Sequence, residues 1–312
     1  MTKILVTGGA GFIGGALVHK LLENKENFVV VTDLLTTGYL HNLPRNNTNL
    51  KFIKCDVNNF KSISSVFYAF SFDYVFHYAA VVGVKRTLEN PLSVLHDIEG
   101  IDNVLSLSKD TGVKRVFYSS SSEVYGEPVE LPQNEDTTPL NSKLPYAIVK
   151  NVGEAYLKAY KKEFNLDYTI FRFFNTYGPR QTSDFVMRKF ITLALKNSDI
   201  PIYGTGEQTR TFCYIDDNIE ATMNAFYGNL GLNDVFNVGN DNETAILHLA
   251  KLIIHETNSS SKIIFQAPLP EGDMTRRKPD IAKMKILLNR ELLPLVEGIR
   301  MVIKSVKENH KG

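Results

Sequence analysis

The sequence has few cysteines, almost no net charge and no long apolar run. Its 312 residues include two cysteines, Cys55 and Cys213, too few for a disulfide scaffold or a thiolate metal site, so we expect structural roles for both and no bound metal. A net charge of +1 gives no field that would attract nucleic acid or an anionic membrane. No apolar run approaches about 18 residues, so we expect a soluble, cytoplasmic protein.

Apolar residues make up 43% of the chain, enough for a large core, and 312 residues exceed the length at which a single core usually suffices. Helical spacing separates strand-like runs, which predicts an α/β fold with a doubly wound parallel sheet and a smaller C-terminal lobe. We place one domain at 1–174 and the lobe mainly at 175–312, with the chain free to cross between them. The expected strands are 3–7, 28–32, 50–54, 74–78, 114–120 and 167–173.

A glycine-rich turn follows the first expected strand. Gly8, Gly11 and Gly14 are spaced GxxGxxG, and Phe12 and Ile13 open the helix that follows. Without Cβ atoms, such a turn lets a diphosphate approach backbone N–H groups at the positive end of a helix. The pattern therefore predicts a dinucleotide site.

Acidic residues end the next two expected strands. Asp33 lies 19 residues after Gly14, close to the ~20 expected for the carboxylate that holds an adenosine ribose. That carboxylate would repel a 2′-phosphate, which favours NAD over NADP. Asp56 and Val57 follow the third strand and are candidates to hydrogen-bond to and pack on the adenine, although Asp is also common in turns.

Tyr146 and Lys150 are four residues apart and share one face of an expected helix. A phenol has an unperturbed pKa near ~10, and a neighbouring ammonium favours the phenolate. Tyr146 is therefore a candidate base for a substrate hydroxyl. The spacing alone carries little weight, and its value comes from the dinucleotide motif before it.

Together these features resemble an extended short-chain dehydrogenase/reductase of the NAD-dependent nucleotide-sugar epimerase, dehydratase and decarboxylase family. The resemblance covers essentially the whole chain and implies a Rossmann-like fold. The matching segments are 7–14, 77–80, 119–126, Tyr146 with Lys150, 172–180 and 210–217.

By this resemblance, Ser121 hydrogen-bonds the sugar hydroxyl that is oxidised, Tyr146 removes the O4 proton, and Lys150 binds the nicotinamide ribose. Ala79 and Ala80 join the cofactor site. The remaining expected substrate residues are Ser122, Asn175, Tyr203, Arg210 and Arg277. Of these, Asn175 contacts the diphosphate or sugar, the two arginines flank the phosphates, and Tyr203 stacks on the base or packs on a sheet.

The resemblance leaves the reaction open. A family 4,6-dehydratase usually has an Asp-Glu pair where this chain has Ser122-Glu123, which argues against ordinary dehydration. Glu123 is a candidate base, or a carboxylate that supports its loop. Arg277 and its neighbours resemble UDP-glucuronate decarboxylases, whereas 138–145 resembles the general epimerase pattern. We expect a UDP-sugar 4-epimerase, of the glucose, N-acetylglucosamine or glucuronate type, with the decarboxylase as the alternative.

Other expectations follow from the same resemblance. Asp97 stands where the family usually has Asn. Family members commonly dimerise through two helices, so we expect a homodimer through 92–109 and 146–163. A non-catalytic NAD-binding regulator would tolerate loss of Tyr146 or Lys150, and both are present, which disfavours that class.

Overall fold

The computed structural model describes residues 1–312 except 83–86, 88, 269–275 and 310–312. It divides into two compact units. The first unit comprises 1–124, 142–172 and 219–236, and the second comprises 125–141, 173–218 and 237–312. No helix in the described part of the chain is both long and apolar enough to cross a membrane.

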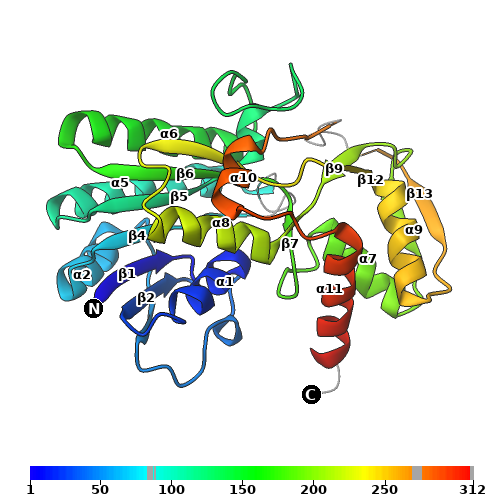
Figure 1. Cartoon of the computed structure of the whole chain (residues 1–312), viewed down its shortest axis with the longest axis horizontal. Helices are drawn as coiled ribbons and strands as arrows, with labels where there is room; N and C mark the ends of the chain where they lie inside the picture. The colour runs from blue at the N-terminus through cyan, green and yellow to red at the C-terminus, as the bar shows by residue number, and fades with distance from the viewer. Residues whose placement is uncertain (83–86, 88, 269–275, 310–312) are drawn as a thin grey trace. The chain divides into compact units, whose positions relative to one another are not determined.

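A seven-stranded sheet forms the centre of the first unit, in the order β11-β6-β5-β4-β1-β2-β3 (Figure 1). β1 pairs in parallel with β2 and with β4, so Val6 lies opposite both Val31 and Phe76. This arrangement confirms the predicted doubly wound α/β fold. The strands are β1 (Thr2–Thr7), β2 (Asn27–Asp33), β3 (Leu50–Lys54), β4 (Tyr74–His77), β5 (Arg115–Ser121), β6 (Asp167–Phe173) and β11 (Asp234–Val238).

The helices around this sheet begin and end at recognisable signals. Asn59 caps α2 by accepting a hydrogen bond from Ser62 N at 2.9 Å, and α6 begins with Pro145 and ends at Asn165 in the left-handed conformation. The helix expected at 92–109 is two helices, since α4 ends and α5 begins at His96. The helices are α1 (Phe12–Leu21), α2 (Phe60–Phe70), α4 (Pro91–Leu95), α5 (Asp97–Asp110), α6 (Pro145–Phe164) and α8 (Ile215–Tyr227).

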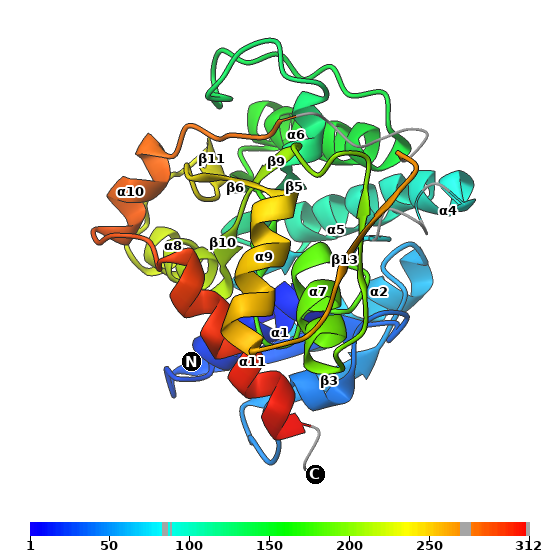
Figure 2. The same cartoon turned by 90° about the vertical axis from the view of Figure 1, so that its right-hand side faces the viewer.

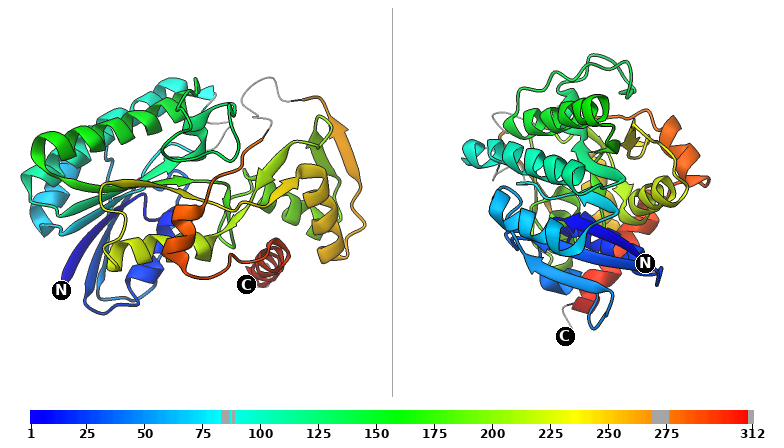
Figure 3. Two further views of the ribbon diagram at one scale, coloured as in Figure 1. Left: turned by 45° about the horizontal axis from the view of Figure 1, so that its top comes forward. Right: turned by 90° about the vertical axis from the view of Figure 1, so that its left-hand side faces the viewer.

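The sheet is buried on both faces because successive side chains of a strand point in opposite directions. Val75 on β4 belongs to a cluster with side chains of α2, α5 and α6. The next residue, Phe76, faces the other way and stacks on Phe117 at 4.4 Å between ring centroids. Phe226 of α8 meets both rings edge-on. Figure 3 shows the resulting layers of helix, sheet and helix.

The second unit contains short two-stranded sheets packed with helices. β9 pairs with β12 antiparallel, whereas β10 pairs with β7 and β13 pairs with β8 in parallel. Figure 2 shows α7, α9 and α11 from the side of this unit. Its elements are β7 (Thr176–Tyr177), α7 (Val186–Leu195), β8 (Ile200–Tyr203), β9 (Thr209–Thr211), β10 (Cys213–Tyr214), β12 (Glu243–Ala245), α9 (Ile246–Thr257), β13 (Ile263–Gln266), α10 (Ala282–Leu288) and α11 (Leu295–Asn309).

A single boundary at 174 does not describe the chain. Residues 219–236 return to the first unit, and residues 125–141 belong to the second. Residues 219–236 return because they lead into β11, the edge strand of the main sheet. There the backbone of β11 forms hydrogen bonds with β6.

Candidate active site

The predicted cofactor residues lie at one edge of the main sheet. Parallel strands present their carboxyl ends on the same side, and ligands of open α/β sheets bind there. Strands β1 to β5 are followed or ended at that edge by Gly8, Asp33, Asp56, Ala79 and Ser121, respectively. The structure therefore brings together residues that are up to 113 positions apart, as the sequence predicts.

The glycine turn is a cradle without room for side chains. Gly8 has φ +67°, and a Cβ there would lie 2.6 Å from Ala79 N. A Cβ on Gly14 would lie 2.4 Å from Gly8 O. Gly11 is the N-cap of α1, so the first turn of the helix, Phe12 and Ile13, presents backbone N–H groups with no capping side chain. This geometry fits the diphosphate of a dinucleotide.

Asp33 is held beside that turn. Its Oδ2 accepts a hydrogen bond from Ala10 N at 3.0 Å, and its Oδ1 accepts one from Leu35 N at 2.8 Å. A carboxylate has about four lone-pair sites, so two further hydroxyl groups can be bound. The position fits the two hydroxyls of an adenosine ribose.

The remaining predicted cofactor residues lie in backbone segments that hydrogen bonds hold in place. Asp56 Oδ1 accepts a hydrogen bond from Asn58 N at 2.9 Å, and Val57 O accepts one from Asn103 Nδ2 at 3.0 Å. Ala79 N donates to Thr7 Oγ1 at 3.2 Å, and Ala80 beside it is half-buried. These contacts fix the backbone at the ends of β3 and β4.

Tyr146 and Lys150 both lie on the first two turns of α6. Lys150 is 3% exposed, and its Nζ lies 5.7 Å from the centre of the Tyr146 ring and 5.0 Å from that of Tyr118. The ammonium donates to Ser119 Oγ at 3.4 Å. The predicted pairing of phenol and ammonium is therefore present in the fold.

Burial lowers the pKa of Lys150 to about 8, and the negative charge of Asp97 opposes that shift. Asp97 Oδ2 accepts a hydrogen bond from Val81 N at 2.7 Å, while burial raises its own pKa. Burial, with a smaller contribution from the positive charge of Lys150, lowers the pKa of His77 to about 3. His77 is therefore neutral. The positive charge at this point of the sheet edge is therefore that of Lys150.

The serine-rich strand end continues into a single turn of 3-10 helix. Ser121 is the last residue of β5 and accepts a hydrogen bond from Glu123 N at 3.2 Å. Ser122 is 1% exposed, whereas Glu123 is half-buried. The turn therefore carries a single carboxylate, that of Glu123, directly after the strand.

A buried ion pair fixes α6 on the sheet. Glu154 lies one turn beyond Lys150 and accepts hydrogen bonds from Arg172 Nε at 2.9 Å and Arg172 Nη2 at 2.7 Å. Ser120 Oγ donates to the same carboxylate at 2.5 Å. The two charged side chains are 1% and 2% exposed. Sequence reasoning missed Glu154, although the spacing that links Tyr146 to Lys150 continues to it.

Asn175 of the second unit has two features of a ligand-binding residue. Its φ of +29° is in the left-handed region, which is uncommon for residues other than glycine. Its Nδ2 is buried and has no hydrogen-bond partner among the described residues. A buried donor of this kind costs free energy unless a ligand accepts from it.

The other predicted substrate residues also belong to the second unit. Tyr203 ends β8, with Lys189 Nζ 5.5 Å from the centre of its ring. Arg210 lies on β9 and is buried, and its Nη1 donates to Thr209 O at 2.7 Å. Arg277 is also buried. Each unit thus holds its own set of predicted residues, catalytic and cofactor residues in the first and most substrate residues in the second.

Both cysteines are free and buried. Burial raises the pKa of the Cys55 thiol to about 11, which suits a structural role. Within the described ranges, no three His, Cys, Asp or Glu side chains are grouped so that they could hold a metal ion.

Comparison with known proteins identifies relatives of this chain. Residues 4–239 match the model of the NAD dependent epimerase/dehydratase family. A putative UDP-glucose 4-epimerase from Methanocaldococcus jannaschii is 36% identical over 99% of both chains. UDP-glucuronic acid decarboxylase 4 from Arabidopsis thaliana is 33% identical over 99% of this chain and 70% of the relative.

Among solved structures, UDP-glucose 4-epimerase from Thermotoga maritima, determined with UDP-glucose, superposes with a TM-score of 0.93. It is 33% identical, and the match covers 99% of this chain and 100% of that one. The family match spans well over half of the sequence and includes the glycine turn, Tyr146 and Lys150. The chain belongs to the NAD dependent epimerase/dehydratase family.

Proposed function

We propose that this protein is a UDP-sugar 4-epimerase that oxidises its substrate transiently at C4. The observation that carries the proposal is the buried Lys150 beside Tyr146 at the sheet edge that also holds the glycine cradle and Ser121. This set provides a base, a cation and a hydroxyl for one sugar hydroxyl.

Each residue has a defined part in this mechanism. Ser121 Oγ hydrogen-bonds the C4 hydroxyl, and Tyr146 accepts the O4 proton and later returns it. Lys150 stabilises the phenolate of Tyr146 by its positive charge and contacts the nicotinamide ribose. NAD, when bound, would supply reversible acceptance of a hydride from C4, and return of that hydride to the opposite face of the sugar would invert C4.

Residues of the first unit hold the cofactor in this proposal. The turn from Gly8 to Gly14, with Phe12 and Ile13, binds the diphosphate, and Asp33 binds the adenosine ribose. Asp56 and Val57 would hold the adenine, and Ala79 and Ala80 would complete the cofactor site. The preference for NAD follows from the carboxylate of Asp33, which disfavours a 2′-phosphate.

Residues of the second unit bind the nucleotide sugar in this proposal. The free donor of Asn175 serves the diphosphate or the sugar, and the buried guanidinium groups of Arg210 and Arg277 serve the phosphates. Tyr203 stacks on the base. Ser122, in the first unit, contacts the sugar beside Ser121.

Decarboxylation of UDP-glucuronate is the second candidate. It shares the C4 oxidation, after which a 4-keto uronate is a β-keto acid that readily loses CO₂. The sequence similarity to the Arabidopsis decarboxylase favours it, and the guanidinium of Arg277 would pair with the carboxylate of the uronate. Ser122 stands where a family dehydratase usually has the Asp that protonates the leaving hydroxyl, which disfavours 4,6-dehydration.

The test is product analysis with purified protein. UDP-glucose, UDP-N-acetylglucosamine and UDP-glucuronate are incubated separately, and the products are followed by mass spectrometry and proton NMR. An unchanged mass with an inverted C4 proton signal supports epimerisation. Loss of CO₂ from the uronate as the main reaction overturns it in favour of decarboxylation. Tyr146→Phe is the control for chemistry by contaminants.

We also propose that the protein is a homodimer through α4, α5 and α6. Large apolar side chains on α4 and α6 are exposed, with Leu92 81%, Ile148 39% and Phe164 50% accessible. A second copy would bury them. Light scattering should give twice the 35.1 kDa chain mass, and Leu92→Lys with Ile148→Lys should give monomers. A monomeric unmodified protein would refute the proposal.

A further inference from the structure

The segment that carries Arg277 is anchored on both sides. Before it, Arg276 donates to both oxygens of Glu243, at 2.9 Å from Nε and 2.6 Å from Nη2. After it, Gln133 N donates to Lys278 O at 2.7 Å, and Asp280 N donates to Gln133 O at 2.8 Å. The buried Arg277 therefore projects from a short backbone segment that neighbouring residues hold at each end.

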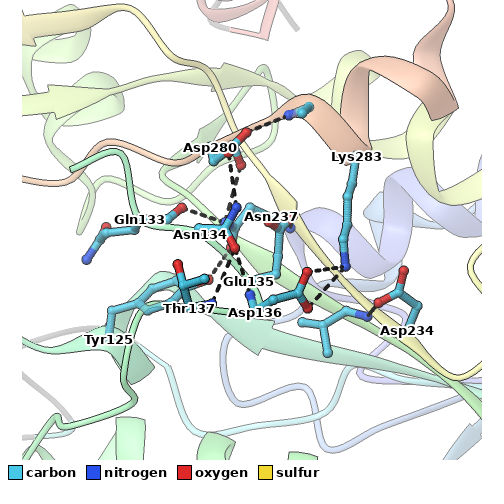
Figure 4. A network of polar contacts seen from close by, with 12 residues as sticks. Tyr125, Gln133, Asn134, Glu135, Asp136, Thr137, Asp234, Asn237, Asp280 and Lys283 are labelled. Atoms are coloured by element: carbon cyan, nitrogen blue, oxygen red, sulfur yellow. Dashed lines mark hydrogen bonds and ion pairs between the residues drawn. The ribbon is translucent and has the colours of Figure 1, made fainter. Parts of the chain in front are cut away.

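A single buried amide extends this anchoring. Asn237 is completely buried, and its Nδ2 donates to Gln133 O at 2.9 Å and to Asp280 O at 3.3 Å. Its Oδ1 accepts from Tyr125 OH at 2.7 Å, and its backbone N donates to Glu135 Oε1 at 2.8 Å. Figure 4 shows Asn237 among Tyr125, Gln133, Glu135 and Asp280.

The chemistry of this position requires an amide. The side chain donates to two carbonyl oxygens and accepts from a phenol, and only an amide side chain of this size does both. Aspartate has the same shape but donates nothing when ionised. It would also place a second carboxylate close to Glu135, whose own pKa is already raised by burial.

Tyr125 links the amide to the turn that carries Ser122 and Glu123. The 3-10 turn runs from Ser122 to Tyr125, so Tyr125 is its last residue, and its ring is 1% exposed. One side chain, Asn237, thus contacts the end of this turn and the segment that presents Arg277.

We propose that Asn237 is a positioning residue that fixes the Arg277 segment and the end of the Ser122–Tyr125 turn together. Binding of the donor diphosphate and presentation of the sugar hydroxyl then depend on the same buried amide. This inference rests on the proposed function for its ligand. The structural coupling itself needs no ligand and can be measured separately.

The test compares Asn237→Asp with a matched control, Asn240→Asp. Asn240 is also buried, but its Oδ1 only accepts a hydrogen bond, from Asn242 N at 2.8 Å, and a carboxylate preserves that contact. Hydrogen exchange followed by mass spectrometry reports on 125–137 and 276–280. Calorimetry with UDP and steady-state kinetics report on the site.

In the 312-residue chain, Asn237→Asp should speed amide exchange in both segments. It should weaken UDP binding and lower kcat, each by about tenfold or more, because a displacement near 1 Å can cost about 10²-fold. Asn240→Asp should match the unmodified protein. If Asn237→Asp does not fold, Tyr125→Phe removes one hydrogen bond and should lower kcat more than it raises KM.

Three results are decisive. Faster exchange in only one segment, or in neither, overturns the coupling. Equal effects of Asn237→Asp and Asn240→Asp show that added charge alone is responsible, which also overturns it. If the unmodified protein neither binds UDP nor converts a UDP-sugar, the proposed function is wrong, and so is the part of this inference that concerns the ligand. The hydrogen-exchange result still decides whether the two segments are coupled.

Discussion

Replacing Glu154 with Gln tests how α6 is held against the sheet. The Glu154 and Arg172 side chains are almost fully buried and share two hydrogen bonds, and Ser120 adds a third. Glutamine keeps the shape and still accepts from Ser120. It removes the negative charge that compensates the buried guanidinium.

The cost follows from burial. Removing one partner of a buried ion pair destabilises a protein by about 3–5 kcal/mol, because the other charge stays out of water without that compensation. For a unit of this size, each kcal/mol lowers Tm by about 2–4 °C, so a fall of about 10 °C is expected. Scanning calorimetry of Glu154→Gln measures it. Glu163→Gln, on the exposed end of α6, should change stability by less than about 0.5 kcal/mol.

The double variant Glu154→Leu with Arg172→Met separates charge from packing. Because both charges are removed, it should be more stable than Glu154→Gln, in line with about 1–4 kcal/mol gains seen when buried pairs become apolar. A Tm for Glu154→Gln within 2 °C of the unmodified protein, which corresponds to a loss of at most about 0.5–1 kcal/mol, would refute the reasoning. So would a double variant less stable than the single one.

Three further predictions concern the site and the second unit. Tyr146→Phe should lower kcat by about 10²–10⁴-fold with UDP affinity unchanged by calorimetry; a variant that keeps a tenth of the activity contradicts its role as base. Activity should fall as pH rises through about 8, where Lys150 loses its proton. Asp97→Asn removes a charge that raises this pKa, so the alkaline limb of the kcat profile should move to lower pH, and a move to higher pH contradicts it. Gln133→Met should stabilise the protein to urea by about 1–3 kcal/mol, since both amide atoms of Gln133 are buried without a described partner; lower stability contradicts this.

Much of the fold follows from local pattern. The apolar runs that end at Asp33 and Ser121 became β2 and β5 close to the expected bounds, because parallel strands buried on both faces read as continuous apolar segments. The position of β11 in the sheet does not follow from local pattern. Its sequence indicates a strand, but only its pairing with β6, more than 60 residues earlier, shows that it completes the main sheet.

The candidate site divides in the same way. The glycine turn, Asp33, and Tyr146 with Lys150 are visible because spacing within one turn or helix encodes them. Asn237 is not visible in this way, since its partners Tyr125 and Gln133 lie more than 100 residues away. In the sequence, Asp97 is visible only as a departure from the family pattern, and its contact with Val81 N is visible only in the structure.

Transient oxidation at C4 is tested most directly with UDP-glucose that carries deuterium at C4. The purified protein should convert it to the C4 epimer with the label retained at C4, because the same hydride equivalent leaves and returns. Proton NMR and mass spectrometry measure both inversion and label. Inversion with loss of the label to solvent, or no inversion together with CO₂ release from UDP-glucuronate, would contradict the account.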